Sequence, residues 1–463
     1  MVDKIKFVGW AIISGLILWS TISLFNQASS QVLHEDEYQH THLAWNSFQG
    51  KVIYRDFEDS HGPLSTLLYS FFLKVYPRAV ESVATFFYLR SINTLAVVLT
   101  GLLLALCVFK FTNKKAAGAL ALLIFLSSPA IRTMAFRIRP DCYVALFSVL
   151  SFFCWQKCWH FLMGLCLGTA FALHAKFLPI NLCILGAACY LSFKKKRPVG
   201  MLLLGESAVL AGIALWLWHH RALSLAWKGF LFTGFNTAFQ RLVLRTESTQ
   251  LLQEASRTEM FIGALCFLSL IFLVFWVSKR RALPWSSEWV MGATYTAASV
   301  AFLFAPVWGH ALVFVIPTGL IFLVSSVFLT PSLEKGFSVL AVALCAVMGF
   351  TNLEKANRGK ELQAGQLESL EFALNNTKRT DPVFYVWTSR CPAYVFNEDS
   401  SRDWLKPFRR TSTTQPIRML PPVNYLSFHP MFLGILDEDE KKYVEENFTA
   451  HGCFWVRNAI GSH

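Results

Sequence analysis

Acidic and histidine side chains crowd residues 33–64, directly after the first apolar run of the sequence. The pair Asp36 and Glu37 comes first, and His40 stands four residues after Asp36, so a helix would place Asp36 and His40 on one face. Two further candidate binding residues follow in the same segment, Asp56 and His61. A partly dehydrated carboxylate can have a raised pKa and act as a general base. The alternative interpretation is a solvated acidic start to a surface helix.

Cationic side chains follow at several other boundaries of apolar runs. RTMAFRIRPDCYVALF carries arginines, a proline and an aspartate before an apolar run, and LHAKFLP carries a lysine between two such runs. Arginine binds phosphate bidentately and lysine binds it as a point charge, although helix capping and lysine snorkelling explain the same residues without a ligand. With the acidic segment they predict a site for a ligand with an anionic headgroup and an apolar tail. The candidates in this set are Arg90, Arg139, Asp141, Lys176 and His310.

The composition indicates a membrane protein with many spans. The chain has 463 residues, of which 54% are hydrophobic and only 15% charged. Its net charge of +13 comes largely from short basic clusters between apolar runs, which are typical of membrane anchors and not of a nucleic-acid-binding stripe. The sequence also has no zinc-type cysteine spacing and no P-loop. We therefore expect no nucleic-acid partner.

Eleven apolar stretches are predicted to span the membrane, each near the required length of roughly 17–25 residues. They cover residues 7–27, 88–109, 116–131, 141–156, 159–174, 178–193, 200–218, 259–277, 287–305, 311–329 and 336–352. The first is interpreted as an uncleaved span and not as a signal peptide. The basic clusters place the N-terminus inside, so the regions expected outside are 28–87, 132–140, 219–258 and 353–463. Residues 64–73 are too short to cross and are expected in the membrane interface.

The chain is thereby divided into a transmembrane domain, residues 1–352, and a C-terminal soluble domain, residues 353–463. In the second part, residues 362–376 and 437–448 have helical spacing, whereas DPVFYVW and CFWVRN are typical of strands. We expect a small α/β or α+β domain. Cys391 and Cys453 fit either a disulfide or two free thiols.

The sequence resembles the GT-C glycosyltransferases of the protein O-mannosyltransferase and aminoarabinose-transferase type, over roughly residues 5–352. The resemblance is carried by DEYQHTHLAW and YRDFEDSHGPL after the first span, by Arg90, and by RIRPD, HAKF and WGHALVFVIP. It implies an all-α polytopic GT-C fold and an inverting transfer of a sugar from a polyprenyl-phosphate donor on the outer face. The last motif departs from the pattern, because GHAL lacks the basic or aromatic neighbour that many relatives have beside the histidine.

Residue roles follow from the same resemblance. Asp36 would be the base that deprotonates the acceptor, Glu37 would position the acceptor or the sugar, and Asp141 would be a second acid of the site. Three cations would hold the leaving phosphate: Arg90, Arg139 and Lys176. No cofactor is expected with certainty, but some relatives use a divalent metal ion. The candidate metal ligands are Asp36, Glu37, His40 and Asp141.

The expected partners are a polyprenyl-phosphate sugar, membrane lipids, and an acceptor that is a lipopolysaccharide, another cell-envelope glycan, a lipid or a protein. The short loops favour a bacterial inner membrane with a cytoplasmic N-terminus and a periplasmic C-terminal domain; a eukaryotic form would place that domain in the lumen of the endoplasmic reticulum. Three other functions stay open: a polyprenyl-linked glycan ligase or polymerase, a lipid-linked sugar transporter or flippase, and a non-catalytic receptor. Few ionisable residues lie within the spans, Glu206 being the main exception, which argues against a transport path.

Overall fold

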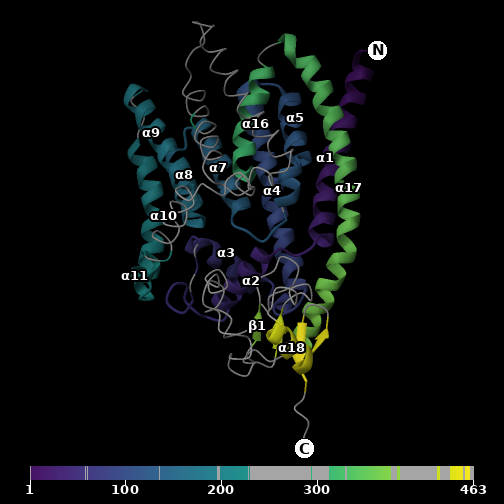
Figure 1. Cartoon of the computed structure of the whole chain (residues 1–463). Coiled ribbons are helices and arrows are strands. Elements are labelled where there is room, and N and C mark those ends of the chain that lie inside the picture. Colours follow the sequence, from purple (N-terminus) through teal and green to yellow (C-terminus); the bar gives the residue numbers. More distant parts are fainter. Residues whose placement is uncertain are drawn as a thin grey trace, which may run out of the picture.

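The structure is a computed structural model that describes residues 2–57, 59, 61–134, 136–195, 199–227, 229, 294, 312–328, 331–376, 383–385, 425–427, 438–451 and 454–458. Long helices form a bundle, and the start of α1 lies at the end of the bundle opposite the small C-terminal sheet (Figure 1). The long helices are α1 (Val2–Ser30), α4 (Ala84–Thr112), α5 (Lys115–Ser127), α7 (Asp141–Gln156), α8 (His160–Leu173), α9 (Leu178–Lys195), α10 (Val199–His219), α16 (Leu312–Phe328) and α17 (Pro331–Asn376).

The predicted spans correspond closely to described helices. The span expected at 141–156 is α7, and those at 159–174, 178–193 and 200–218 are α8, α9 and α10. The span expected at 116–131 is interrupted, because α5 ends at Ser127 and Pro129 begins the short helix α6 (Pro129–Met134). The spans expected at 259–277 and 287–305 lie outside the described residues.

Within the described part of the chain, three helices are long and apolar enough to cross a membrane by length and composition. They are Phe7–Ser30, Ala84–Thr112 and Val199–His219. The remaining apolar helices of the bundle, such as α7 and α8, are shorter. A total of eleven spans therefore stays a prediction.

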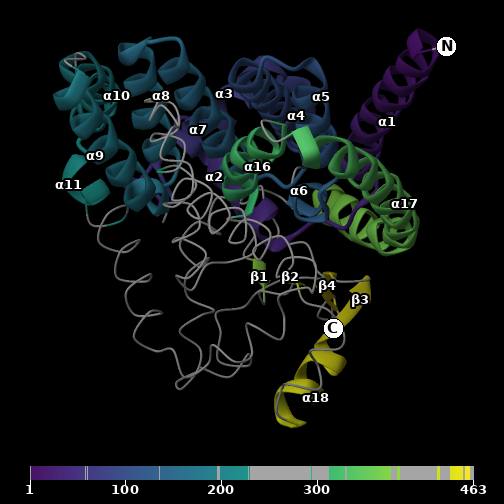
Figure 2. The ribbon, with the colours of Figure 1, turned by 90° about the horizontal axis from the view of Figure 1, so that it is seen from above.

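Close backbone contact joins α8 and α10. A Cβ added to Gly164 would lie 2.0 Å from the carbonyl oxygen of Leu202, and one added to Gly205 would lie 2.2 Å from that of Phe161. Small residues at these positions let the two helix backbones approach. Viewed from above, α8, α9 and α10 form one side of the bundle, and α1 and α17 lie at the other (Figure 2).

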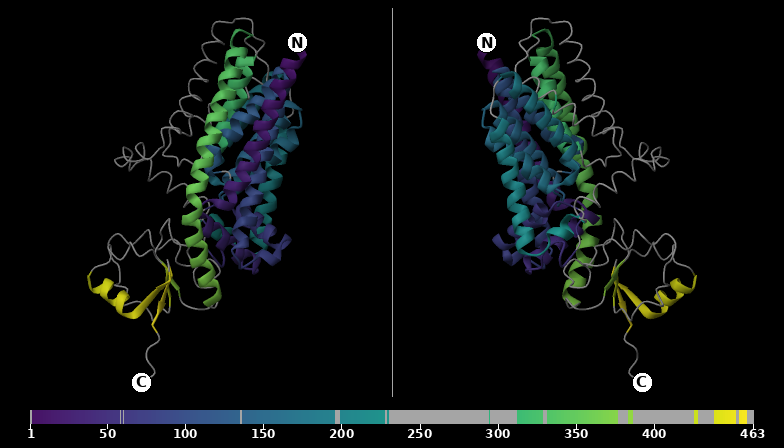
Figure 3. Two further views of the ribbon diagram at one scale, coloured as in Figure 1. Left: turned by 90° about the vertical axis from the view of Figure 1, so that its right-hand side faces the viewer. Right: turned by 90° about the vertical axis from the view of Figure 1, so that its left-hand side faces the viewer.

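Helix α17 is continuous from Pro331 to Asn376. It joins the predicted span 336–352 to the predicted helix 362–376, so the predicted domain boundary at residue 353 falls inside a helix. α17 contacts α1 and continues to the end of the bundle where the C-terminal sheet lies (Figure 3).

The C-terminal sheet has the strand order β1-β2-β4-β3, with β1 and β2 parallel and the other pairs antiparallel. Its strands are β1 (Val383–Tyr385), β2 (Tyr425–Ser427), β3 (Phe448–His451) and β4 (Phe454–Arg457), and α18 (Glu438–Asn447) precedes β3. DPVFYVW and CFWVRN correspond to β1 and β4, and the predicted helix 437–448 corresponds to α18. β2 and β3 were not predicted. Cys391 and Cys453 lie outside the described residues.

Two short helices lie at the same end of the bundle as this sheet, α2 (Glu35–Phe48) and α3 (Pro63–Val75) (Figures 1 and 3). α3 is the element expected at 64–73, and Pro63 occupies its first turn, where no N–H partner is needed. The acidic segment and the C-terminal sheet therefore share one end of the molecule.

Candidate active site

The first turn of α2 places Asp36 and Glu37. His34 is the N-cap, and its Nδ1 accepts a hydrogen bond from the backbone N–H of Asp36 at 3.3 Å. The Glu37 side chain completes a capping box by accepting from the His34 backbone N–H at 2.8 Å. Because consecutive helical residues point about 100° apart, the two acids face different surroundings.

Glu37 is fully buried and paired with Arg90 of α4. Arg90 Nε and Nη2 donate to the two carboxylate oxygens of Glu37, each at 2.7 Å. Arg90 also donates to the carbonyl oxygens of Ala28, Gln31 and Val32 at 3.0, 2.7 and 2.9 Å. Five hydrogen bonds thus use the five N–H groups of the guanidinium, and none is left for a ligand in this arrangement.

Both oxygens of the Glu37 carboxylate carry a second hydrogen bond. Oε2 accepts from His34, and Oε1 accepts from the backbone N–H of Ile138 at 3.2 Å. Burial raises the pKa of Glu37, but the charge and hydrogen bonds of Arg90 outweigh this effect and keep the pKa below its usual range. Glu37 therefore links the end of α1, the start of α2, α4 and the segment before α7.

Asp36 points instead to Arg139, which it shares with Asp141. Arg139 Nη1 donates to Asp36 Oδ2, and Nε donates to Asp141 Oδ2 at 2.9 Å. The side chains of Asp36, Arg139 and Asp141 are 23%, 10% and 4% exposed, so Asp36 is the member most open to solvent. Burial raises the pKa of Asp36, but the charge of Arg139 outweighs this effect and holds the pKa well below the usual range. Asp36 is therefore an ionised carboxylate whose charge is stabilised by Arg139.

Arg137 is a half-buried cation beside this group. It belongs to the RIRPD motif, but the sequence analysis assigned it no role. Its guanidinium forms no ion pair among the described residues, while its backbone carbonyl accepts from Asn93 Nδ2 at 2.5 Å. Burial lowers the pKa of Arg137, and the nearby carboxylates of Glu37 and Asp36 oppose this. The Arg-x-Arg spacing with Arg139 was the signal that could have assigned it to the same binding site.

Three histidines and the buried Asp59 form a group next to Asp36. Asp59 Oδ1 accepts from the backbone N–H of His61 at 2.8 Å and contacts His61 Nδ1 at 3.0 Å, and Oδ2 accepts from Thr66 at 2.9 Å. The rings of His40 and His61 lie 4.5 Å apart, and those of His61 and His174 lie 5.5 Å apart. Burial, followed by the neighbouring His61, lowers the pKa of His40 to about 3, so His40 is neutral at physiological pH.

The other predicted residues lie apart from this group or outside the description. Asp56 is exposed and accepts from the backbone N–H of Val52 at 2.7 Å and from Arg55 at 2.8 Å, so it closes a surface turn. Lys176 belongs to the short helix η2 (Ala175–Phe177), but its side chain is outside the description. His310 is outside the described residues as well.

The candidate metal ligands do not form a metal site. Among the described residues, no three His, Cys, Asp or Glu side chains have an arrangement that could hold a metal ion. The carboxylate of Glu37 is occupied by Arg90 and by backbone N–H groups, and Asp36 and Asp141 both face Arg139. This donor set does not fit a cation.

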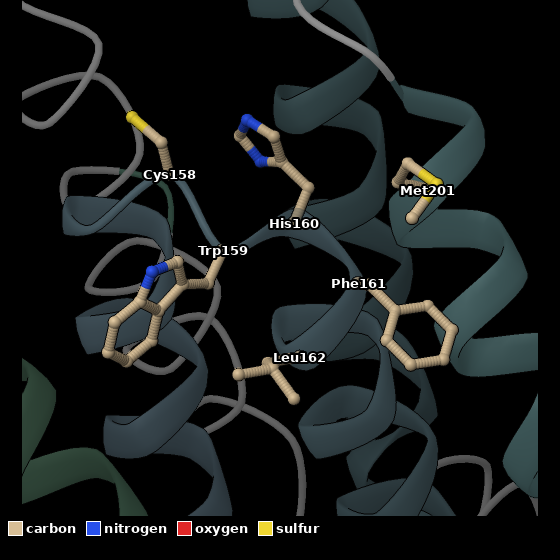
Figure 4. Close-up of a pocket in the computed structure, with 6 residues that line it drawn as sticks. All are labelled: Cys158, Trp159, His160, Phe161, Leu162 and Met201. Atoms are coloured by element: carbon tan, nitrogen blue, oxygen red, sulfur yellow. The ribbon is translucent and has the colours of Figure 1, made fainter.

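A shallow surface hollow of about 360 Å³ lies elsewhere, at the start of α8 (Figure 4). Cys158, Trp159 and His160 line it together with Phe161, Leu162 and Met201. The opposite end of α8 approaches the site, because Gly62 N–H donates to the carbonyl of Leu173 at 3.2 Å. The hollow is therefore separated from Asp36 by the length of α8.

Almost the whole chain shares its fold with ArnT from Cupriavidus metallidurans. The crystal structure of ArnT bound to undecaprenyl phosphate matches with a TM-score of 0.57 and 13% identity over 98% of each chain. The apo structure matches with a TM-score of 0.59 and 13% identity over 97% of this chain and 98% of ArnT. The apo oligosaccharyltransferase of Archaeoglobus fulgidus gives a TM-score of 0.45 at 12% identity, over 97% of this chain and 75% of that one, which is too low to support an argument.

No protein-family model matches the sequence, and no curated protein matches it. The structural matches to ArnT extend along almost the whole chain, in agreement with the fold that the sequence resemblance implied. At 13% identity these matches establish the fold and leave the activity to be argued from the site.

Proposed function

We propose that the protein is a membrane glycosyltransferase that moves a sugar from a polyprenyl-phosphate donor to an acceptor hydroxyl or amine, with Asp36 as general base. The observation that carries the proposal is the arrangement of Asp36 and Asp141 around Arg139. Arg137 lies beside them, and its guanidinium forms no ion pair with any described residue. Support for a polyprenyl-phosphate ligand comes from ArnT, which shares the fold and whose crystal structure holds undecaprenyl phosphate.

Donor binding and base activation are coupled through Arg139 in this proposal. Arg139 uses Nε and Nη1 for the two aspartates, and within the described structure its Nη2 forms no hydrogen bond. A donor phosphate that engages Arg137 and Arg139 competes with Asp36 for the guanidinium. When Arg139 shares its positive charge with the donor phosphate, the effect of burial on Asp36 is less opposed and the pKa of Asp36 rises. Asp36 thus becomes an effective base only when the donor is bound.

The transfer itself needs one bond formed and one broken. The acceptor atom attacks the anomeric carbon from the side opposite the phosphate, and the carbon–oxygen bond to the phosphate breaks with its electron pair leaving on the phosphate. The acceptor proton passes to Asp36. Arg137 and Arg139 stabilise the charge that develops on the leaving phosphate, which is the larger electrostatic contribution, while the sugar passes through an oxocarbenium-like state. The reaction inverts the anomeric configuration.

Glu37 and Arg90 are assigned a structural role here, and not the acceptor and phosphate binding that the family resemblance implied. Their carboxylate and guanidinium are saturated by each other and by backbone groups. Lys176, His61, Asp56 and His310 remain proposed binding residues, of which His61 adjoins the site through His40.

The proposed orientation places α2, α3 and the C-terminal sheet outside the membrane, periplasmic in a bacterial inner membrane or lumenal in the endoplasmic reticulum. Lys114 and Lys115 stand at the start of α5, and Lys157 stands at the end of α7, in both cases at the end of the helix away from α2. This placement of lysines agrees with the positive-inside rule. The proposed division of the chain stays at residues 1–352 for catalysis and 353–463 for the C-terminal domain, with acceptor choice assigned to the outer end.

The test measures release of undecaprenyl phosphate by protein in lipid nanodiscs. A panel of undecaprenyl-phosphate pentoses, hexoses and aminosugars is supplied with lipopolysaccharide, glycan, lipid and protein acceptors. We expect release with one donor class, and a loss of about 10²-fold or more in Arg139→Gln. Arg78→Gln is the matched control, since Arg78 is an exposed arginine in the short helix η1 (Pro77–Ala79) and belongs to none of the proposed binding residues. Release that ignores Arg139 would reject the site, and donor binding without release from any donor would favour a receptor or transporter.

A further inference from the structure

One side chain of α17 clamps the segment that leads into α2. Gln366 Oε1 accepts from the backbone N–H of Leu33 at 2.8 Å, and Gln366 Nε2 donates to the Leu33 carbonyl oxygen at 3.3 Å. The two residues are 333 positions apart in the sequence. Gln366 is 4% exposed and Leu33 is fully buried. An amide that pairs with both backbone groups of one residue holds it as a neighbouring strand would.

The clamped residue lies directly before the cap of the catalytic turn. Leu33 precedes His34, whose side chain accepts from the Asp36 backbone N–H and whose backbone donates to Glu37. A shift of Leu33 therefore moves the N-cap and with it the first turn of α2. Asp36 is 23% exposed and contacts Arg139 through one oxygen, so it has less packing to hold it than Glu37.

The same helix is in contact with the C-terminal sheet. Ala373, two turns after Gln366 on α17, is buried and packs with Val456 of β4. Contacts thus run from β4 to the end of α17, from Gln366 to Leu33, and from His34 to Asp36. All of these elements lie at one end of the bundle (Figures 1 and 3).

We infer that Gln366 is a positioning residue for Asp36, through which α17 and the C-terminal sheet set the place of the catalytic carboxylate. The inference rests on the proposed function, because it assigns to Gln366 an effect on turnover. It also gives the C-terminal domain a part in catalysis besides acceptor choice.

The test compares Gln366→Leu with Gln363→Leu. Leucine at 366 removes both hydrogen bonds with little change in volume. Gln363 is the matched control: it lies one turn earlier on α17, is 5% exposed, and its Nε2 has no hydrogen-bond partner in the described structure. A displacement of about 1 Å can cost roughly a hundredfold in rate, and we expect kcat to fall about tenfold or more in Gln366→Leu with an unchanged KM for the donor. Gln363→Leu should keep native kcat.

A double-mutant cycle with Asp36→Glu separates positioning from general weakening. The longer side chain already displaces the carboxylate, so Gln366→Leu should lower kcat less than about twofold in that background. Equal losses in the native and Asp36→Glu backgrounds would overturn the inference, as would native kcat in Gln366→Leu. If Gln366→Leu does not fold, Gln366→Glu replaces it, since a carboxylate keeps the acceptor for the Leu33 N–H and loses the donor.

Hydrogen exchange distinguishes a failed clamp from a failed function. Backbone amides of residues 33–37 should exchange faster in Gln366→Leu than in the native protein and in Gln363→Leu. Unchanged exchange would overturn the clamp whatever the activity. Faster exchange in a protein that turns over no donor would overturn the proposed function, and with it the catalytic role of Gln366.

Discussion

Removal of the Glu37 carboxylate is expected to destabilise the protein, because it strands a buried charge. The side chains of Glu37 and Arg90 are both 0% exposed, and each is fully hydrogen-bonded. In Glu37→Met the guanidinium keeps its carbonyl acceptors but loses two charge-assisted hydrogen bonds. An unpaired buried charge of this kind costs about 3–5 kcal/mol of unfolding free energy.

Three further variants test whether the loss in Glu37→Met comes from the stranded charge. Arg90→Met leaves the carboxylate unpaired and should cost a similar amount. The double variant removes both charges, and we expect it to lose no more than one single variant does, since an apolar pair avoids the stranded charge. Arg55→Met removes an exposed ion pair and should change the unfolding free energy little.

Equilibrium unfolding in mixed detergent micelles, followed by tryptophan fluorescence, measures these differences. Turnover is measured on the same samples at a temperature where all variants are folded. A double variant that loses as much unfolding free energy as the two single variants together would refute the buried pair. Native stability with lost turnover in Glu37→Met would return Glu37 to the role of an acceptor-binding residue that the family resemblance implied.

Three further predictions concern charge, packing and the donor. Burial raises the pKa of Asp59, but the hydrogen bond to His61 outweighs this effect and keeps the pKa below its usual range. The ionised Asp59 therefore stabilises the fold above the unfolded pKa of about 4, and this stabilisation is lost as the pH falls through the folded pKa. Unfolding temperatures measured against pH should show the loss, and the pH dependence should be weaker in Asp59→Asn. Gly62→Ala places a Cβ 1.9 Å from the carbonyl oxygen of Ala172 and should lower the unfolding temperature strongly, whereas Gly186→Ala, with nothing within 4 Å, should not. Arg137→Ala should raise the donor KM about tenfold without lowering the unfolding temperature, because Arg137 forms no ion pair with any residue that the structure describes. Unchanged donor titrations would remove Arg137 from the phosphate site.

The helices of the bundle could be predicted because their apolar runs have sharp polar ends. α7 begins at Asp141 after Pro140 and ends at Gln156, as the sequence indicates. The continuity of α17 could not be predicted in the same way. The residues after 352 turn polar, and a loss of apolar character marks the membrane boundary without marking the end of a helix.

The group of Asp36, Arg139 and Asp141 could be predicted, since acids and cations at one membrane face attract one another. The different settings of Asp36 and Glu37 could not, because they depend on long-range geometry. Arg90 comes from α4, and the carbonyl groups that complete its shell come from the end of α1 and the segment after it. Every residue has a backbone carbonyl group, so the residue types do not reveal which carbonyl groups accept these hydrogen bonds.

Asp59 was missed for a related reason. It stands in an acidic run beside Asp56, and its burial follows from its bonds to His61 and Thr66 rather than from its own chemistry. Asp56, which looked equivalent in sequence, closes an exposed turn with Arg55. Neighbouring residues of the same type thus differ in function because the fold buries one of them.

In the proposed mechanism Asp36 takes the acceptor proton during sugar transfer, and single-turnover release of undecaprenyl phosphate is the measurement closest to this step. Asp36→Asn keeps the size of the side chain and removes the base, so donor binding should persist while the rate of release falls by about 10²–10⁴-fold. Release at the native rate, in a variant that binds donor and acceptor normally, would show that Asp36 is not the base.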